Sequence, residues 1–287
     1  TFNPDIVEGS NVVCYLPACV IARFKKIPAV AWVPDVLGPD WRHFGITGWF
    51  GQLLEWFSLK LPWDHYLALS HQTQIKLLAL GIKPEKITIT YPGINLKEFN
   101  FPVVKRRLPT LCVIARLVSY KQVDHALDLL YQLKPQLPQA RLLIIGQGPE
   151  QSKLISQIKS LKLDQQIYLK SRLPRADLIK QLKSCHILCH FSLVEGFGLV
   201  LLEALAAGLP YIAYDTPINR EVTHSGRGGI LVGLNDIAAA ASAVQRLLTT
   251  PKLYHTKVKQ GQTLLANYSW TKSASTTDTV YHSLVKK

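Results

Sequence analysis

Residues 187–213 carry the pattern that most restricts how this chain can fold. An apolar run that predicts a buried strand leads through a glycine-containing loop into a stretch that is apolar on nearly all sides. Gly208 and Pro210 predict the end of that helix, and a second apolar run follows them. A strand, a buried helix and a further strand in this order favour a parallel sheet covered by helices.

The same alternation continues along the chain and predicts two sheets. In the first part, Ser70 and Gly81 predict the start and the end of one helix. Residues 91–109 contain prolines and little periodicity, so we interpret them as a linker. The expected strands lie at 5–7, 29–32, 66–69 and 87–91 before the linker, and at 111–115, 142–145, 167–169, 187–191, 211–213 and 230–232 after it.

Glu203 is the one charged side chain between Glu195 and Asp215. An ionised carboxylate in apolar surroundings is costly unless it is paired or hydrogen-bonded, although a solvent-facing side chain or a structural hydrogen bond would also explain it. Glycines before a helix let a ligand approach the backbone, and the N–H groups at a helix start favour anions. Because carboxylates accept hydrogen bonds from sugar hydroxyls, these residues point to a nucleotide or a nucleotide sugar.

The segment EGFGLVLLEALAAGLP resembles the E-x7-E motif of the retaining glycosyltransferases of family 4, which have the GT-B fold. This resemblance implies an α/β chain with two Rossmann-type domains whose parallel sheets face a cleft. It implies a partial acceptor-side domain with its linker at 1–108 and a nucleotide-sugar-binding domain at 109–270. Residues 271–287 would form a closing helix that packs back toward the first domain. The family's first half-domain has no counterpart here, so we expect a fragment or a natural variant lacking it.

The resemblance also assigns roles to the residues of this motif. Glu195 would lie by the hydroxyls of the donor sugar, and Glu203 would lie by the ribose. The backbone amides of Gly196, Phe197 and Gly198 would face the sugar and the phosphates.

A second group of candidate residues follows the expected strand at 111–115. Arg116 and Lys121 are two cations that both reach one diphosphate if their loop wraps around it, although alone they would be ordinary surface cations. By resemblance they match the family's phosphate-binding pair and assist departure of the nucleoside diphosphate. Arg172 and Leu173 lie where relatives contact the base, and residues 146–149 resemble a glycine turn below the nucleotide that a plain turn explains equally well.

On the acceptor side the chain departs from the family pattern. Asp35 matches an acid that often follows a histidine near the donor sugar, but Pro34 stands where that histidine would be. Proline has no side-chain donor or acceptor. His43 is a nearby candidate, although a single histidine beside aromatic residues is more often structural.

Aromatic residues cluster in the first part of the chain, where five of the six tryptophans lie between Trp32 and Trp63. Residues 49–57 have helical apolar spacing. Two interpretations remain open: a helix that inserts into a membrane surface, and an ordinary helix packed on the first sheet.

Composition excludes several other classes. The 287 residues include no apolar run of the ~18 to 20 residues that cross a bilayer, and no signal peptide opens the sequence, which lacks Met altogether. The net charge of +14 comes without a nucleic-acid-binding motif, so we expect no nucleic-acid partner. Five scattered cysteines favour reduced thiols and a cytoplasmic location. Peripheral contact with a membrane is expected only under the first interpretation of residues 49–57. The Cys and His residues of 185–190 alternate faces of a strand, so they do not form a zinc site.

The prediction is therefore retaining transfer of a sugar from a UDP- or GDP-linked donor to a glycan, a lipid or a small molecule. No cofactor and no metal is expected. The alternatives are a non-catalytic nucleotide-sugar-binding or scaffold protein, and a GT-B-type nucleotide-sugar epimerase.

Overall fold

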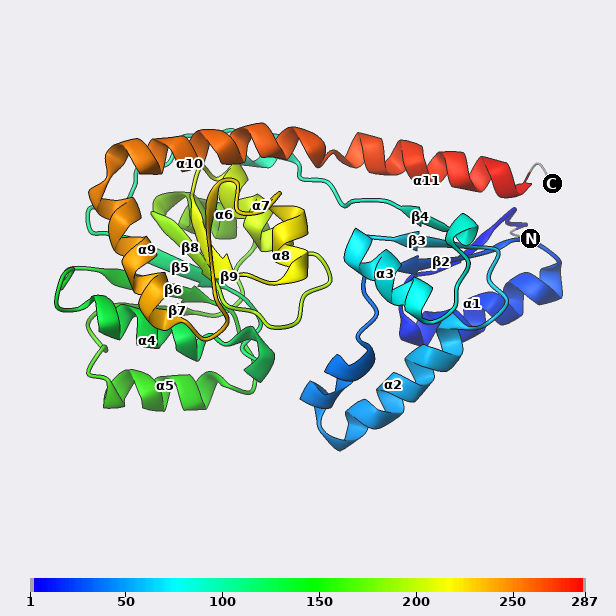
Figure 1. Cartoon of the computed structure of the whole chain (residues 1–287), viewed down its shortest axis with the longest axis horizontal. Coiled ribbons are helices and arrows are strands. Elements are labelled where there is room, and N and C mark those ends of the chain that lie inside the picture. Colours follow the sequence, from blue (N-terminus) through cyan, green and yellow to red (C-terminus); the bar gives the residue numbers. More distant parts are fainter. Residues whose placement is uncertain (1–2, 286–287) are drawn as a thin grey trace. The chain divides into compact units, whose positions relative to one another are not determined.

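The computed structural model describes residues 3–285, which divide into two compact units. The first unit contains the chain up to Gly93, the short segment 195–197 and the chain from Tyr268 onward, and the second contains 94–194 and 198–267. Each unit is built around one parallel sheet, so the expected α/β fold class with two parallel sheets is confirmed (Figure 1).

The sheet of the first unit has the order β1-β2-β3-β4, and all neighbouring strands are parallel. One face packs on α1 and α3, with Tyr15, Tyr66 and Leu77 in the core, and the other face packs on α11 through Val280. The elements of this unit are β1 (Val7–Gly9), α1 (Val12–Lys25), β2 (Ala29–Val33), η1 (Gly38–Phe44), α2 (Ile46–Leu59), β3 (His65–Ala68), α3 (His71–Ala79), η2 (Pro84–Lys86), β4 (Ile87–Ile89) and α11 (Trp270–Val285).

Local signals explain where several of these elements begin. The side chain of Ser70 accepts a hydrogen bond from the backbone N–H of Thr73 at 3.0 Å and caps α3, as predicted. The prediction for β1 was wrong by two residues, because the strand covers Val7–Gly9 rather than 5–7. Gly9 sits in the core, where a Cβ would lie 3.0 Å from the ring of Trp63, and this close packing fixes the register.

The sheet of the second unit has the order β10-β9-β8-β5-β6-β7, again all parallel. The chain starts at the central strand β5, moves outward to β6 and β7, and then continues from β8 in the opposite direction. The elements are η3 (Leu96–Phe99), β5 (Thr110–Ile114), η4 (Ser119–Lys121), α4 (Asp124–Leu133), β6 (Arg141–Ile145), α5 (Gln151–Ser160), β7 (Ile167–Lys170), α6 (Arg175–Ser184), β8 (Ile187–His190), α7 (Leu199–Ala206), β9 (Tyr211–Tyr214), α8 (Pro217–Val222), β10 (Gly229–Val232), α9 (Ile237–Thr249), α10 (Pro251–Leu264) and η5 (Leu265–Asn267).

This strand order creates a topological switch point between β5 and β8. Open parallel sheets bind ligands at such points, beyond the carboxyl ends of the strands. Helices α4, α5 and α9 share the core of one sheet face. Helix α7, whose Leu201 and Leu202 are fully buried, contacts β8, β9 and α10, so its predicted burial is confirmed.

None of the helices in residues 3–285 is long and apolar enough to span a bilayer.

Candidate active site

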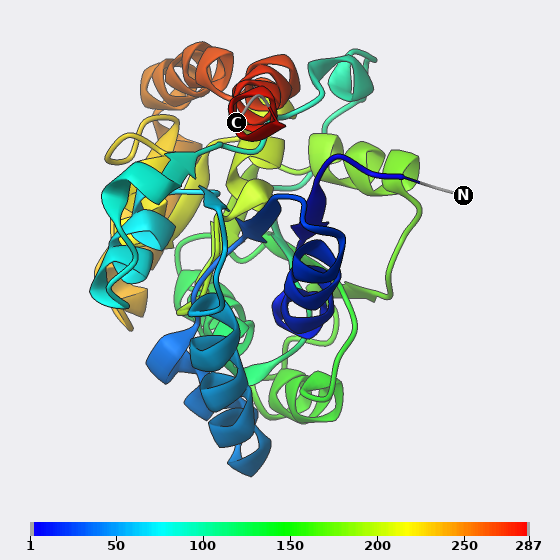
Figure 2. The ribbon, with the colours of Figure 1, turned by 90° about the vertical axis from the view of Figure 1, so that its right-hand side faces the viewer.

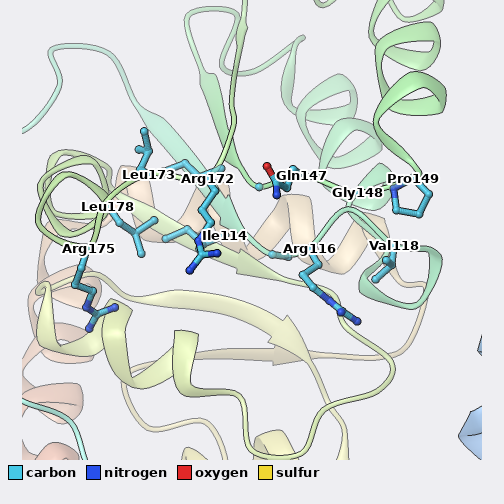
Figure 3. A pocket seen from close by; sticks show the side chains of 13 residues that line it. Ile114, Arg116, Val118, Gln147, Gly148, Pro149, Arg172, Leu173, Arg175 and Leu178 are labelled. Atoms are coloured by element: carbon cyan, nitrogen blue, oxygen red, sulfur yellow. The ribbon is translucent and has the colours of Figure 1, made fainter.

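A pocket of about 740 Å³ opens beyond the carboxyl ends of β5, β6 and β7 in the second unit (Figure 3). Its volume lies within the range of small-molecule sites, about 300 to 1,000 Å³. The residues that line it are Ile114, Ala115, Arg116, Val118, Ile145, Gly146, Gln147, Gly148, Pro149, Arg172, Leu173, Arg175 and Leu178. The pocket therefore includes Arg116, Arg172 and Leu173, which the sequence had singled out, and the glycine turn at 146–149.

The glycine turn and the Arg116 loop form one wall through direct backbone contact. A Cβ on Gly146 would lie 1.8 Å from the carbonyl oxygen of Ala115, and one on Gly148 would lie 2.2 Å from that of Leu117. The backbone N–H of Leu117 also donates to the carbonyl of Gln147 at 3.0 Å. A side chain at either position would collide with the neighbouring loop, so the glycines allow the two loops to pack directly on each other.

The charges on the pocket wall are all positive. Arg116 follows β5, whereas Arg172 and Arg175 lie between the end of β7 and the first position of α6, and their guanidinium groups extend toward the same side in Figure 3. No acidic residue is among the lining residues. Arg116 donates to the hydroxyl of Tyr120 at 2.5 Å, and within residues 3–285 no ion pair joins Arg116 or Arg172 to an acid. Such a wall suits a phosphorylated ligand.

Arg175 differs, because two carboxylates hold it. Its Nε donates to Glu98 at 2.9 Å, and its Nη1 donates to Oε1 of Glu203. Burial lowers the pKa of Arg175, but the hydrogen bonds to Glu203 and Glu98 outweigh it, so the net shift is upward. The Glu203 side chain is only 17% exposed. The sequence indicated that a carboxylate in these apolar surroundings needs a partner, and Arg175 is that partner.

Sequence reasoning missed Arg175. Arg175 lies 28 residues before Glu203, at the first position of α6. The composition of α6 is that of an ordinary surface helix. The one available signal was its place directly after Pro174, at a helix start beyond a strand. Helices α6 and α7 must both be placed before the pair becomes visible.

Lys121 lies outside the pocket lining but is fixed beside the loop after β8. Its Nζ is 3.5 Å from the carbonyl oxygen of Val194 and 5.5 Å from the centre of the Tyr120 ring. The backbone N–H of Leu193 donates to the carbonyl of Tyr120 at 2.9 Å. The loop that carries Arg116 and Lys121 is therefore joined to the segment that leads directly into Glu195.

Residues 195–197 themselves pack with the first unit. The ring of Phe197 is buried against Tyr91 and Tyr268, with centroids 6.0 and 5.8 Å away. A Cβ on Gly196 would lie 2.9 Å from the carbonyl oxygen of Pro34 and 3.2 Å from the Cβ of Asp35. The glycine thus brings the backbone next to Glu195 against the segment that carries Asp35.

Asp35 is a largely buried carboxylate, with its side chain 11% exposed and one of its two oxygens hydrogen-bonded. Its Oδ1 accepts hydrogen bonds from Lys76 and from the backbone N–H of Val36, each at 2.8 Å, whereas its buried Oδ2 has no hydrogen-bond partner among the described residues. Burial raises the pKa of Asp35, against the opposing effect of Lys76. A buried acid with a raised pKa and an open acceptor is a candidate for a chemical role. His43, the other acceptor-side candidate, is half-buried in η1.

Within residues 3–285 no group of three or more His, Cys, Asp or Glu side chains is placed to hold a metal ion. Cys185 ends α6 while Cys189 lies in β8, and both are buried.

Comparison with known proteins identifies the class. The family described as glycosyl transferases group 1 matches residues 97–263, which is more than half of the chain. The chain belongs to this family. The expected glycosyltransferase class is therefore confirmed at the level of group 1. The use of nucleotide sugars by this group agrees with a cationic pocket beyond β5, β6 and β7.

Two relatives of this glycosyltransferase chain align with different portions of its sequence. It is 26% identical to a glycogen synthase of Mycobacterium tuberculosis over 291 residues, spanning 98% of this chain and 69% of that protein. It is 36% identical to an exopolysaccharide phosphotransferase of Streptomyces coelicolor over 162 residues, which are 55% of this chain and 17% of that protein.

Solved structures share the fold. HepE of Anabaena in complex with UDP and glucose superposes with a TM-score of 0.82 at 17% identity, covering 99% of this chain and 78% of that one. Sucrose-phosphate synthase from Thermosynechococcus elongatus also gives a TM-score of 0.82, at 19% identity, over 98% of this chain and 73% of that one. The GT-B-like fold is thus common to these chains.

Proposed function

We propose that this chain is a family 4-type glycosyltransferase that moves a sugar from a UDP-linked donor to an acceptor with retained configuration. The observation that carries the proposal is the cationic pocket beyond β5, β6 and β7, with Glu203 held by Arg175 next to it. Support for UDP comes from relatives of the same fold, since HepE was crystallised with UDP-glucose and a pneumococcal O-GlcNAc transferase with UDP and GlcNAc.

The diphosphate would lie along the Arg116 wall. Arg116 and Arg172 carry charges that no acid neutralises among the described residues, so they attract the phosphates without first breaking an ion pair. Charge builds on the nucleoside diphosphate as the glycosidic bond breaks, and fixed cations lower the barrier by stabilising it. In this proposal Arg116 and Lys121 act on the leaving group and need no metal ion to assist them.

Glu203 would accept hydrogen bonds from the ribose hydroxyls. Arg175 occupies Oε1, so the second oxygen of the carboxylate keeps its lone pairs for a ligand. Glu195 would accept from the hydroxyls of the donor sugar, while the amides of 196–198 face the sugar and the phosphates. Asp35 would act on the acceptor side, where its open Oδ2 receives a proton or a hydrogen bond from the attacking hydroxyl.

The first test is calorimetric titration of the chain with UDP, GDP and ADP. We expect selective binding of UDP and a loss of about 10- to 100-fold in Glu203→Ala, since a hydrogen bond to a charged group contributes about 1.5 to 3 kcal/mol. Glu85→Ala, which changes an exposed glutamate in the first unit, is the matched control and should bind UDP as the parent does.

Product analysis then separates the alternatives. A glycosylated acceptor whose anomeric proton shows the configuration of the donor supports the proposal. Donor that is bound but unchanged, over a full acceptor screen, would identify a binding or scaffold protein. Donor altered in the absence of any acceptor would identify an epimerase or hydrolase.

A further inference from the structure

Helix α2 exposes an unusual number of large apolar side chains for its length of 14 residues. Isolated apolar residues on a surface need no explanation, but a contiguous group on one helix does. Their exposed fractions lie between 43% and 88%, and they are Ile46, Trp49, Phe50, Leu53, Leu54, Trp56 and Phe57. Figure 2 shows α1 and α2 with no other element of the first unit in front of them.

The orientation of α2 is fixed by its inner face, which carries the small and charged residues. A Cβ on Gly48 would lie 1.9 Å from the backbone oxygen of Trp41, and one on Gly51 would lie 2.4 Å from the Trp41 ring. The carboxylate of Glu55 is buried and accepts from the backbone N–H groups of Leu37 at 3.0 Å and Gly38 at 2.8 Å. Rotating α2 to bury its apolar side would leave this carboxylate unpaired. It would also replace the glycines that face Trp41 by larger side chains, which would force the backbones of α2 and η1 apart.

This arrangement removes charge from the outer face of α2. Glu55 is the one charged residue in the helix, and it points inward. Helix α1, which packs against α2, also exposes large apolar side chains, including Val13, Val20 and Phe24. Two neighbouring helices of one unit thus present apolar residues outward.

Basic residues predominate among the exposed charges of these helices, although Arg23 forms an ion pair with Asp64 at 3.0 Å. Between residues 12 and 60 every exposed charged side chain is basic, whereas the acids of that segment are buried or half-buried. Lys60 stacks over the ring of Trp56 at 4.9 Å, at the end of α2. Besides the paired Arg23, the exposed cations are Lys25, Lys26, Arg42 and Lys60.

We propose that α2, with the cations around it and the neighbouring α1, binds an anionic lipid bilayer surface. A helix of 14 residues is about 21 Å long, which is shorter than the ~30 Å hydrocarbon core of a bilayer. In this proposal α2 therefore lies along the membrane–water interface. Trp and Phe favour the level of the headgroups, and Lys and Arg are attracted to anionic lipids. A second copy of this chain fits less well, since an isologous contact would place the same cations opposite one another.

The test is flotation of the 287-residue chain with phosphatidylcholine vesicles, with and without phosphatidylglycerol. We expect strong binding to the anionic vesicles, with a blue shift of tryptophan fluorescence. Trp49→Ser with Phe50→Ser should reduce binding at least tenfold. Lys25→Gln with Lys60→Gln should reduce it about thirty-fold, since each cation contributes about fivefold.

Matched controls come from exposed positions of the second unit. Lys252→Gln with Lys259→Gln removes the same charge, and Ile155→Ser with Leu234→Ser removes apolar side chains of similar exposure; both pairs should bind as the parent does. Absence of vesicle binding by the parent, in a preparation with a cooperative thermal transition, overturns the proposal. A second outcome also overturns it: the parent binds no vesicles but forms a concentration-dependent dimer, and Trp49→Ser with Phe50→Ser abolishes that dimer. The apolar surface would then bind a second copy of the chain. Nucleotide titration is independent of either outcome, so it tests the proposed transferase separately.

Discussion

Replacing Arg175 with methionine removes the cation that holds the carboxylate of Glu203 while keeping a long apolar stem. Glu203 is 17% exposed and Arg175 is 44% exposed. A hydrogen bond to a charged group is worth about 1.5 to 3 kcal/mol, but an ion pair with a half-exposed partner is screened to about 1 kcal/mol or less. We therefore expect the free energy of unfolding to fall by no more than about 1 kcal/mol.

The effect on nucleotide affinity should be larger. Without Arg175 the Glu203 carboxylate loses its fixed rotamer. Binding of the ribose must then also order this side chain, which makes the free energy of nucleotide binding less favourable. We expect Arg175→Met to weaken UDP binding about 5- to 30-fold, by calorimetric titration, and Arg175→Lys to recover part of that loss. Arg246→Met, an exposed arginine on α9, is the control and should leave affinity unchanged.

A double-mutant cycle decides whether Arg175 acts through Glu203. In the Glu203→Gln background, Arg175→Met should have little further effect, which gives a coupling energy of about 1 to 2 kcal/mol. Additive losses would refute a role through Glu203. Tighter binding by Arg175→Met would show that Arg175 competes with the ribose for the carboxylate, contrary to the reasoning from the open Oε2.

Three further predictions concern the chemical step. Lys121→Ala should lower turnover about 10²- to 10³-fold with donor affinity changed far less, whereas Lys153→Ala on α5 should change neither; a loss confined to KM would contradict the leaving-group role. Because burial raises the pKa of Asp35 and the ionised form is required, kcat/KM should fall with decreasing pH from a higher pH than for an ordinary carboxylic acid, and Asp35→Asn should remove this limb of the profile. Chelation with EDTA should leave turnover unchanged, since side-chain cations stabilise the diphosphate; a loss that Mg²⁺ restores would contradict that account.

Sequence patterns predicted most strands because buried parallel strands are short apolar runs between turn residues. The β1 prediction missed because its three residues VEG carry no apolar run, and tertiary packing around Gly9 determined its place. Helix α7 was predictable because it is apolar on nearly every side. The orientation of α2 was not predictable, since apolar spacing alone does not show that the side with Glu55 and the glycines faces inward.

The candidate site divides in the same way. Arg116, Arg172 and Glu203 stand out in the sequence because they are charged residues at the ends of strands or inside apolar segments. The pairs Arg175–Glu203 and Lys76–Asp35 join residues 28 and 41 positions apart, so they depend on how helices pack on the sheets. Composition carries no information about such contacts.

The interlocked backbones of the Arg116 loop and the 146–149 turn have a consequence for how this protein could diversify. Each glycine there is fixed by contact with a carbonyl oxygen of the neighbouring loop, so substitutions at these positions disturb the whole wall at once. Arg172 and Leu173 lie on a separate segment after β7. Under the proposed function, substitution of Leu173 alters the part of the pocket assigned to the nucleobase, while the interlocked wall beside Arg116 stays unchanged.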